Sequence, residues 1–519
     1  MLSRLRFKGV FTMTIRRFSN LALSALGVIV CAFLLSRCYE WRGPSGGSQA
    51  TFTPPRIVNP ADIALPPGYS IQAVATGLTF PTGVDFDEDG HVYVLEAGYS
   101  YGEAWDTPRL LRIEATGQPT VIAVGENNGP WTGLAYHQGD FFVVEGGTLR
   151  GGRVLKVSRD GRIDSLVADL PSMGPHPAGG PALDSEGNVY FSVGTLSNAG
   201  VIGEDEAQFG WLTRFPHAHD IPCQTIHLTG ENFTSSNPLT PDEHDTATTG
   251  AFVPFGTATQ RGQIIEGRIP CNGAVFRLSP KDGKLELIAW GFRSAFGLAF
   301  SPDRRLYLTD NSYDDRKRGS RSVHGTGDLL WAVEPKTWYG WPDFHGQRPL
   351  DLGDFFIPPG KQRPPRLLLD PPNVPPSPAA VLDVHASATG FDFSRNALFG
   401  YPGEAFITLF GDQSPTSGKV LSPVGFKVVR VNVETGRIEE FAVNRGRTNG
   451  PASRIGGGGL ERPIAARFDS TGRALYVVDF GVMTVGQSKK LRGAYSDPHE
   501  PTEPRRGTGV LWRISRDKP

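Results

Sequence analysis

A histidine and two arginines occupy matching places ahead of three apolar segments of the sequence. His176 and Arg293 each lie four residues before a glycine that opens such a segment, and Arg462 lies three residues before Ala465. An imidazole with a pKa of about 6.5 can accept a proton at neutral pH, and arginine side chains bind anions. The shared spacing predicts that a proton acceptor and two cations converge on one site.

An amide pair occupies the corresponding place in a further segment, where NNGPW contains Asn127 and Asn128. Because amides both donate and accept hydrogen bonds, they extend the predicted site by a polar contact. His176 also has a simpler interpretation, in which its ring bonds a nearby carbonyl and takes no part in chemistry. The spacing alone leaves both interpretations open.

The segment TDNSYDDRKRGS, residues 309–320, is rich in side-chain oxygens. Its acids and amides lie within six residues: Asp310, Asn311, Asp314 and Asp315. Hard oxygen ligands of this kind suit calcium, although the spacing differs from that of an EF-hand. The alternative is a solvated turn whose acids are neutralised by the next basic residues, which are Arg316, Lys317 and Arg318.

A polar, glycine-rich stretch at residues 200–270 contains several histidines and a cysteine, and a second cysteine follows it directly. Three of its histidines, which are His217, His219 and His227, could bind a metal or lie in an exposed loop. Cys223 and Cys271 could form a disulfide in an oxidising compartment or stay unpaired. The absence of C-x-x-C-H and of paired C-x-x-C disfavours attached haem and structural zinc.

The elements that must position these groups form a repeat. Six segments share a small residue, an apolar stretch, a polar turn and an apolar strand that ends in a polar or glycine corner: 83–98, 133–147, 180–194, 297–311, 390–412 and 465–481. Further strands follow each copy, so that each unit offers about four strands, which is the composition of a propeller blade. One such sheet cannot bury both faces alone, whereas six packed radially can.

The repeat therefore predicts an all-β protein, a six-bladed β-propeller that spans residues 61–517. Three long loop insertions interrupt it, at about 200–270, 342–380 and 412–424. Loops at one end of a propeller channel are held rigid by the blades and commonly carry binding groups. We expect the predicted site at that end.

The bulk composition narrows the class of protein and its partners. The 519 residues include 64 glycines and 43 prolines, which fits many short strands joined by tight turns. A formal charge of -1 lacks the basic excess that nucleic-acid binding requires, so we expect no nucleic-acid partner.

The N-terminal segment indicates export. Residues 1–40 contain a basic stretch followed by the apolar run 21–36, which is typical of a signal peptide or signal anchor. Residues 41–60 have the composition of a flexible linker. We expect a periplasmic or extracellular protein, and the pattern leaves open whether the segment is cleaved, carries a lipid on Cys38 or tethers the chain to a membrane.

Three stretches of the sequence resemble the glucose/sorbosone dehydrogenase family, the soluble sugar dehydrogenases that use pyrroloquinoline quinone on a six-bladed propeller. GFRSAFGLAF looks like the family's G-x-R-N-P-x-G-L-A-F motif, WYGWPDF like its Y-G-W-P stretch, and HPAGGPALDSEGNVYFSVG like the segment with its catalytic base. The resemblance implies a quinoprotein dehydrogenase that oxidises an aldose or a related sugar or aldehyde by hydride transfer to the quinone. It also implies an external electron acceptor.

The resemblance implies a role for each matching position. His176 falls on the general base, Arg293 and Arg462 fall on cofactor-binding arginines, and Asn128 falls on an amide that contacts sugar. The calcium-ligating segment falls on Asn311 with the carbonyls of Ser312 and Tyr313, next to Asp310. The chain departs from the family pattern at Ser294, where the family has asparagine, at Phe410, near the expected lysine, and at Ile464, where it has a second arginine.

Two other functions are open from the sequence. The first is a calcium-dependent propeller lactonase or esterase, which acids at the ends of the copies, such as Glu96, Glu145 and Asp479, would favour. The second is a non-catalytic binding scaffold that has lost the cofactor site, which Phe410 and Ile464 would favour.

Overall fold

The computed structural model describes residue 49 and residues 51–101, 103–314, 316, 320–357, 361–412, 423–485 and 502–517. Contacts divide the chain into Met1–Pro44 and Ser45–Pro519, and the described residues all belong to the second unit. The expected signal segment, and residues 41–48 and 50 of the expected linker, lie outside the described residues. Within the described part, no helix has the length and apolar character to cross a membrane.

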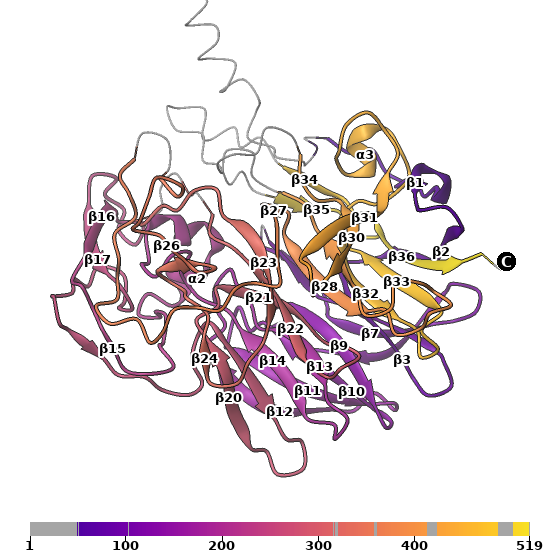
Figure 1. Ribbon diagram of the computed structural model, residues 1–519, viewed down its shortest axis with the longest axis horizontal. Coiled ribbons are helices and arrows are strands. Elements are labelled where there is room, and N and C mark those ends of the chain that lie inside the picture. The colour runs from indigo at the N-terminus through magenta and orange to yellow at the C-terminus, as the bar shows by residue number, and fades with distance from the viewer. Residues whose placement is uncertain are drawn as a thin grey trace, which may run out of the picture. The chain divides into compact units, whose positions relative to one another are not determined.

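Twelve of the strands build the first three blades, each an antiparallel sheet (Figure 1). The first blade contains β3 (Pro81–Phe86), β4 (Val92–Glu96), β7 (Arg109–Ile113) and β8 (Pro119–Val124). The second contains β9 (Trp131–His137), β10 (Asp140–Glu145), β11 (Gly152–Ser158) and β12 (Ile163–Leu170). The third contains β13 (Gly179–Leu183), β14 (Val189–Val193), β19 (Ala274–Leu278) and β20 (Leu285–Trp290), and β24 (Thr337–Trp338) adds a short parallel strand at its edge.

Three further sheets complete the six-bladed propeller that the repeat predicted. The fourth blade contains β21 (Ser294–Phe300), β22 (Leu306–Asn311), β23 (Gly327–Ala332) and β27 (Ala380–Val384). The fifth contains β28 (Ala388–Phe393), β29 (Ala405–Leu409), β30 (Lys427–Asn432) and β31 (Arg437–Asn444), with β1 (Ile63–Ala64) at its edge. The sixth contains β32 (Pro463–Phe468), β33 (Ala474–Asp479), β36 (Gly509–Arg516) and β2 (Tyr69–Leu78).

The ring closes inside the sixth blade. There β2, which precedes the first blade in the chain, pairs with the last strand β36 from Tyr69–Arg516 to Leu78–Gly509 (Figure 1). The first strands of the blades contact one another in the order β3, β9, β13, β21, β28 and β32, and β32 returns to β3. The channel therefore lies between these six inner strands.

Small residues recur on the inner strands because neighbouring backbones approach closely there. A Cβ atom at Gly133 would lie 2.0 Å from the carbonyl oxygen of Gly180, and one at Gly390 would lie 2.9 Å from the Cα of Ala465. Such contacts are shorter than carbon atoms tolerate, so only glycine or a small residue fits. This close approach is the physical origin of the small residue that opens each copy of the sequence repeat.

The long insertions form small elements of their own. Between β14 and β19 lie η2 (Glu204–Phe209), α2 (Trp211–Arg214), β15 (Ile226–His227), β16 (Asn232–Ser236), β17 (Thr246–Gly250) and β18 (Ile264–Ile265), and the disulfide Cys223–Cys271 closes this stretch. Between β23 and β27, besides β24, lie β25 (Phe344–His345) and β26 (Arg348–Pro349). Most of the third insertion, 413–422, lies outside the described residues.

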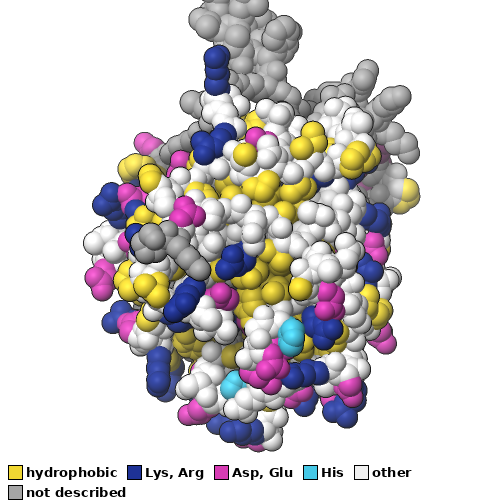
Figure 2. Space-filling view, turned by 90° about the vertical axis from the view of Figure 1, so that its right-hand side faces the viewer, with side chains coloured by type: hydrophobic (Ala, Val, Ile, Leu, Met, Phe, Trp, Pro, Cys, Tyr) yellow, Lys and Arg dark blue, Asp and Glu magenta, His cyan; other side chains and the backbone are white. Residues whose placement is uncertain are grey.

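The remaining short elements lie at the ends of the described ranges or in loops between blade strands. They are η1 (Pro60–Asp62), β5 (Tyr99–Ser100), β6 (Ala104–Trp105), α3 (Ala452–Ile455), β34 (Met483–Val485) and β35 (Thr502–Pro504). On the face shown in Figure 2, side chains of both charge signs are interspersed with apolar ones. This mixed surface fits the near-neutral net charge of the sequence.

Candidate functional site

A cavity of about 80 Å³ lies at one end of the channel, and we call it the mouth cavity. Every blade contributes to its wall, through Thr82, Thr132, Pro177, Phe296, Phe410 and Ile464. Thr82, Thr132, Phe296 and Ile464 stand at the beginning of inner strands. The mouth cavity therefore lies at the channel end where the loops with the predicted site residues enter the blades.

The wall of the mouth cavity is apolar and carries no formally charged residue among those described. Its polar side chains donate to the protein itself: Thr82 to the carbonyl of Trp131 at 2.6 Å, Thr132 to that of Ala178 at 2.7 Å, and Tyr101 to that of Pro175. The rest of the wall is mostly aromatic and aliphatic, including Phe296, Phe480 and Met483. An uncharged molecule fits such a wall better than an ion does, because an ion would lose its hydration there.

His176 is buried directly between Pro175 and Pro177, which both line the mouth cavity. Its Nδ1 lies 2.9 Å from the carbonyl oxygen of Thr195 and 3.0 Å from the hydroxyl of the same residue. A carbonyl only accepts, so Nδ1 carries the proton and Nε2 is the nitrogen that can accept one. Burial, assisted by the charges of Arg293 and Arg316, holds the pKa of His176 well below its usual value. The ring is therefore neutral at pH 7.

The neutral state of His176 predicts a pH-dependent contribution to stability. Because the pKa is lower in the folded state, its contribution is present above about pH 6.5 and is lost as the pH falls towards the folded value. We expect the stability difference between wild type and His176→Gln to be constant from about pH 7 to 8 and to shrink below about pH 6.5, by at most about 1.4 kcal/mol per pH unit. Melting curves would measure it.

The exposed His244 supplies the matched control, because His244→Gln should leave the pH profile of stability unchanged. A gap between wild type and His176→Gln that stays constant from about pH 5 to 8 would contradict a buried neutral imidazole.

Arg293 is buried, and the protein accepts hydrogen bonds from all three nitrogens of its guanidinium group. Its Nε and Nη2 bond Asn198, at 3.1 Å and 2.7 Å from Oδ1, and Nη2 also lies 2.8 Å from a carboxylate oxygen of Asp314. Its Nη1 donates to the carbonyl of Asn311 at 3.0 Å. Burial alone would raise the pKa of Asp314, but Arg293, His385 and Arg316 hold it well below the usual value. Arg293 is thus the centre of an internal ion network.

Arg462 is also buried and faces the fifth blade. Its Nη1 donates to the carbonyls of Gly411 at 3.0 Å and Phe410 at 3.3 Å, and its guanidinium lies 5.0 Å from the ring centre of Phe410 and 5.1 Å from that of Phe426. Burial lowers the pKa of Arg462 to about 10, so the side chain stays protonated at neutral pH. The contacts of this buried charge thus include two backbone carbonyls and two aromatic rings of the protein itself.

The segment expected to ligate calcium directs most of its oxygens to the protein. Asp310 accepts from the backbone N–H groups of Ser294 at 2.8 Å and Arg293 at 3.2 Å, and burial raises its pKa to about 6. The carbonyl of Asn311 accepts from Arg293, and that of Tyr313 accepts from the hydroxyl of Thr326 at 3.0 Å. Ser312 donates its backbone N–H to a carboxylate oxygen of Asp328 at 3.1 Å.

The structure thus brings only some of the predicted residues together. Arg293 contacts Asp310 and Asn311, and its charge acts on His176. Asn128 belongs elsewhere, because its amide donates to Glu145 and to the carbonyl of Gly151 within the second blade. No pattern in the sequence points to Asn198, the main partner of Arg293, because Asn198 lies in a loop outside the repeat.

These observations test whether the residues fit pyrroloquinoline quinone with calcium. The quinone carries three carboxylates and needs cations with donors to spare. Each guanidinium nitrogen of Arg293 already bonds the protein, through Asn198, Asn311 and Asp314. Phe410 lies near the position of the expected lysine and Ile464 at that of the second arginine, and both belong to the apolar wall of the mouth cavity. Within the described part of the chain, the residues at these positions do not fit a trianionic quinone bound with calcium.

The acids that favoured a lactonase have structural roles instead. Each of these acids lies at the end of the second strand of a blade. Each accepts a hydrogen bond from a residue at or near the start of the first strand of the same blade. Glu96 accepts from the N–H of Thr79 at 2.6 Å, and Glu145 accepts from the indole of Trp131 at 3.0 Å. Asp479 accepts from the N–H of Arg462 at 2.8 Å, as Asp310 does from Ser294. The polar corner of the repeat therefore links the first two strands of a blade through a carboxylate, and we call this link the strand clamp.

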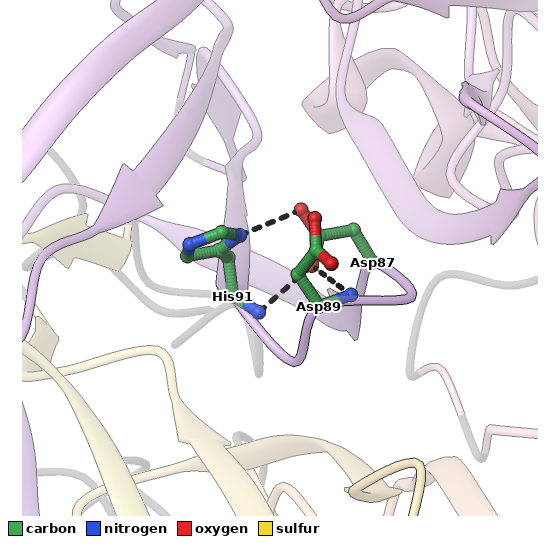
Figure 3. Close-up of side chains that lie close together, drawn as sticks. All are labelled: Asp87, Asp89 and His91. Carbon is green, nitrogen blue, oxygen red and sulfur yellow. Dashed lines mark hydrogen bonds and ion pairs between the residues drawn. The ribbon is translucent and has the colours of Figure 1, made fainter.

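Among the described residues, one group of three side chains has the proximity that a metal ion requires, namely Asp87, Asp89 and His91 (Figure 3). Asp87 accepts from the backbone N–H groups of Asp89 at 3.1 Å and His91 at 2.8 Å, and its other oxygen lies 2.9 Å from the ring Nδ1 of His91. Asp184 accepts equivalent N–H groups, from Glu186 and Asn188, in the third blade. The group is a repeated turn of the blade hairpins.

Comparisons with known proteins support the fold. No family model and no curated protein matches the chain. The holo form of the pyranose dehydrogenase PQQ domain from Coprinopsis cinerea matches with 14% identity, covers 90% of this chain and 100% of that chain, and has a TM-score of 0.51.

Two further solved structures match most of the chain with lower TM-scores. The PQQ-bound aldose sugar dehydrogenase from Streptomyces coelicolor has 15% identity, coverage of 87% and 99%, and a TM-score of 0.46. The calcium structure of the family AA12 carbohydrate-active enzyme from Trichoderma reesei has 16% identity, coverage of 89% and 98%, and a TM-score of 0.49. The chain shares the six-bladed propeller of the quinone-dependent sugar dehydrogenases, as its sequence resemblance implied, and identities at this level show the fold alone.

Proposed function

We propose that the protein binds a small uncharged organic molecule with an apolar face in the mouth cavity, and that it does so without a quinone. The observation that carries this proposal is the wall of the cavity, where Phe410 and Ile464 stand in place of two cations. Ligand pockets are mostly apolar, with a few polar groups that orient the ligand. Here Tyr99, Ser100 and Thr148 supply hydroxyls on one side of the wall.

His176 gives this site a neutral proton acceptor beside the wall. Thr195 fixes the ring through Nδ1, and burial keeps it uncharged. A hydroxyl-bearing ligand that reached Nε2 would be recognised by a hydrogen bond to a neutral imidazole, without an ion pair. We infer that ligands with a carboxylate or phosphate are excluded from the mouth cavity.

Two binding measurements on the purified protein test this proposal. Equilibrium dialysis with pyrroloquinoline quinone and calcium should show no retained quinone at about micromolar concentration. Saturation-transfer NMR with a panel of uncharged alcohols, aldehydes and lactones should show binding that Ile464→Asp abolishes, because a buried carboxylate disfavours an apolar ligand. Quinone retention in the wild type, or ligand binding that is indifferent to Ile464→Asp, would overturn the proposal.

A second candidate is a quinone-dependent dehydrogenase that oxidises an aldose or a related sugar or aldehyde, with an external electron acceptor. The neutral His176, protonated on Nδ1, favours it, because a general base must be uncharged at the working pH. The quinone would supply the hydride acceptor. Sugar-dependent dye reduction by the quinone-loaded protein, lost in His176→Ala while quinone stays bound, would establish this activity in place of the first proposal.

The compartment is part of the proposal. Export to the periplasm or the cell exterior accords with the disulfide Cys223–Cys271, because disulfides persist in oxidising compartments. The possible membrane tether concerns residues outside the described part of the chain.

A further inference from the structure

A second cavity, of about 470 Å³, lies beside the propeller between the second blade and the long insertion, and we call it the side cavity. Its volume is in the range of about 300–1,000 Å³ that ligand pockets occupy. Three stretches of chain form most of its wall, namely 150–173, 215–221 and 268–270. Met173 lines both the side cavity and the mouth cavity, so the two are neighbours with a shared wall.

Buried polar residues fix the walls of the side cavity relative to one another. The amide of Asn272 donates to the carbonyls of Pro171 at 2.6 Å and Gly194 at 2.8 Å, and its oxygen accepts from the N–H of Ile221 at 3.0 Å. Asp220 accepts from the N–H of Leu196 at 2.7 Å. The disulfide Cys223–Cys271 ties the second stretch to the third. The side cavity is therefore a preorganised hollow and not a gap between independent loops.

The floor and the rim of the side cavity differ in chemistry. The floor consists of three buried residues, Leu170, Pro171 and Leu196. The rim carries three exposed residues, Arg150, His217 and Arg268. Arg150 already pairs with the exposed Glu126 at 2.8 Å. Among the described residues, no side-chain hydrogen bond or ion pair engages the guanidinium of Arg268. One acid, Asp169, lies in the same wall, so the arginines outnumber the acids by one.

We propose that the side cavity binds a small organic monocarboxylate with an apolar body, held by Arg268 at the rim and by the leucines of the floor. The planar guanidinium of arginine matches a carboxylate with two parallel hydrogen bonds. Because Arg150 is already paired with Glu126, Arg268 is the rim arginine left for a ligand, and one cation matches a single negative charge. The ligand therefore belongs to a different chemical class from that of the mouth cavity, and the proposal does not depend on the proposed function.

Titration calorimetry on the whole protein tests the side cavity with pairs of ligands that differ only in charge. Phenylacetate, 3-phenylpropionate and hexanoate would each be compared with their primary amides. We expect at least one carboxylate to bind about tenfold more tightly than its amide, which corresponds to one charge-assisted pair. Arg268→Gln should reduce that preference to less than about threefold.

Arg162→Gln is the matched control, because Arg162 is exposed and pairs with Asp164 at 3.1 Å in the outermost strand of the same blade. It should leave the carboxylate preference unchanged, and Ile464→Asp in the mouth cavity should leave it unchanged as well. Absence of a carboxylate preference in the wild type, or a preference that survives Arg268→Gln in a variant with an unaltered melting temperature, would overturn the proposal. Tighter binding of phenyl phosphate than of every carboxylate would also overturn it.

Discussion

Replacing Asp479 by alanine is expected to lower the free energy of unfolding by about 3–5 kcal/mol. Asp479 is fully buried, and its carboxylate lies 2.5 Å from Nη2 of Arg56, whose side chain is itself 3% exposed. It also accepts the backbone N–H groups of Glu461 and Arg462 at 2.8 Å. Alanine would leave a buried guanidinium without its partner carboxylate and two N–H groups without an acceptor, and unpaired buried groups carry the full cost of desolvation.

Denaturant unfolding would measure this cost, with two further variants for comparison. Asp479→Asn keeps an acceptor oxygen and loses the charge, so its cost should be smaller. Glu503→Gln breaks the exposed pair between Glu503 and Arg505 and should cost at most about 1 kcal/mol. A loss below about 1 kcal/mol for Asp479→Ala would show that the strand clamp is not a main source of stability.

Restoring two cations to the mouth cavity is expected to create quinone binding. The double variant Phe410→Lys, Ile464→Arg places positive charges in the wall where the family resemblance implies them. Each charge-assisted bond contributes roughly 1.5–3 kcal/mol, so the affinity for pyrroloquinoline quinone with calcium should rise at least about a hundredfold over that of the wild type. The same variant should lose the uncharged ligands of the wild type, because its wall is no longer apolar.

Quenching of tryptophan fluorescence by added quinone would measure the increase in quinone affinity. Val121→Lys with Val124→Arg is the matched control, since both valines are about half exposed, at 48% and 56%, on the outer strand of the first blade. It adds the same charges away from the channel and should not bind quinone. Equal quinone affinity in the wild type and in the double variant would contradict the assignment of these two positions.

The propeller could be predicted from the sequence because its packing imposes a pattern on every blade. Close contact at the channel selects Gly133 and Gly390, and the strand clamp selects acids such as Asp310 and Asp479. The small residue opens all six copies and the acid stands at or next to the end of the second strand in four of the blades, so both features can be recognised in the sequence without a structure. The convergence of His176 and Arg293 on the channel end follows from the same spacing.

The chemistry of the site could not be predicted in the same way. Whether Arg293 has donors to spare depends on Asn198 and Asp314, which come from different blades and follow no repeat. The apolar wall likewise draws Tyr101, Met173 and Phe480 from loops of three blades. Contacts between residues far apart in the sequence leave no local signature, and they decide which ligands the site accepts.

The pairing of β2 with β36 determines how the ring responds to mechanical force. Tyr69 and Arg516 face each other at the end of this pair where the two strands leave the propeller. Tension applied through these residues would load the hydrogen bonds one after another and would not shear them all together. The ladder would therefore open one hydrogen bond at a time from Tyr69–Arg516 towards Leu78–Gly509, and this antiparallel pair is the first part of the ring closure to yield.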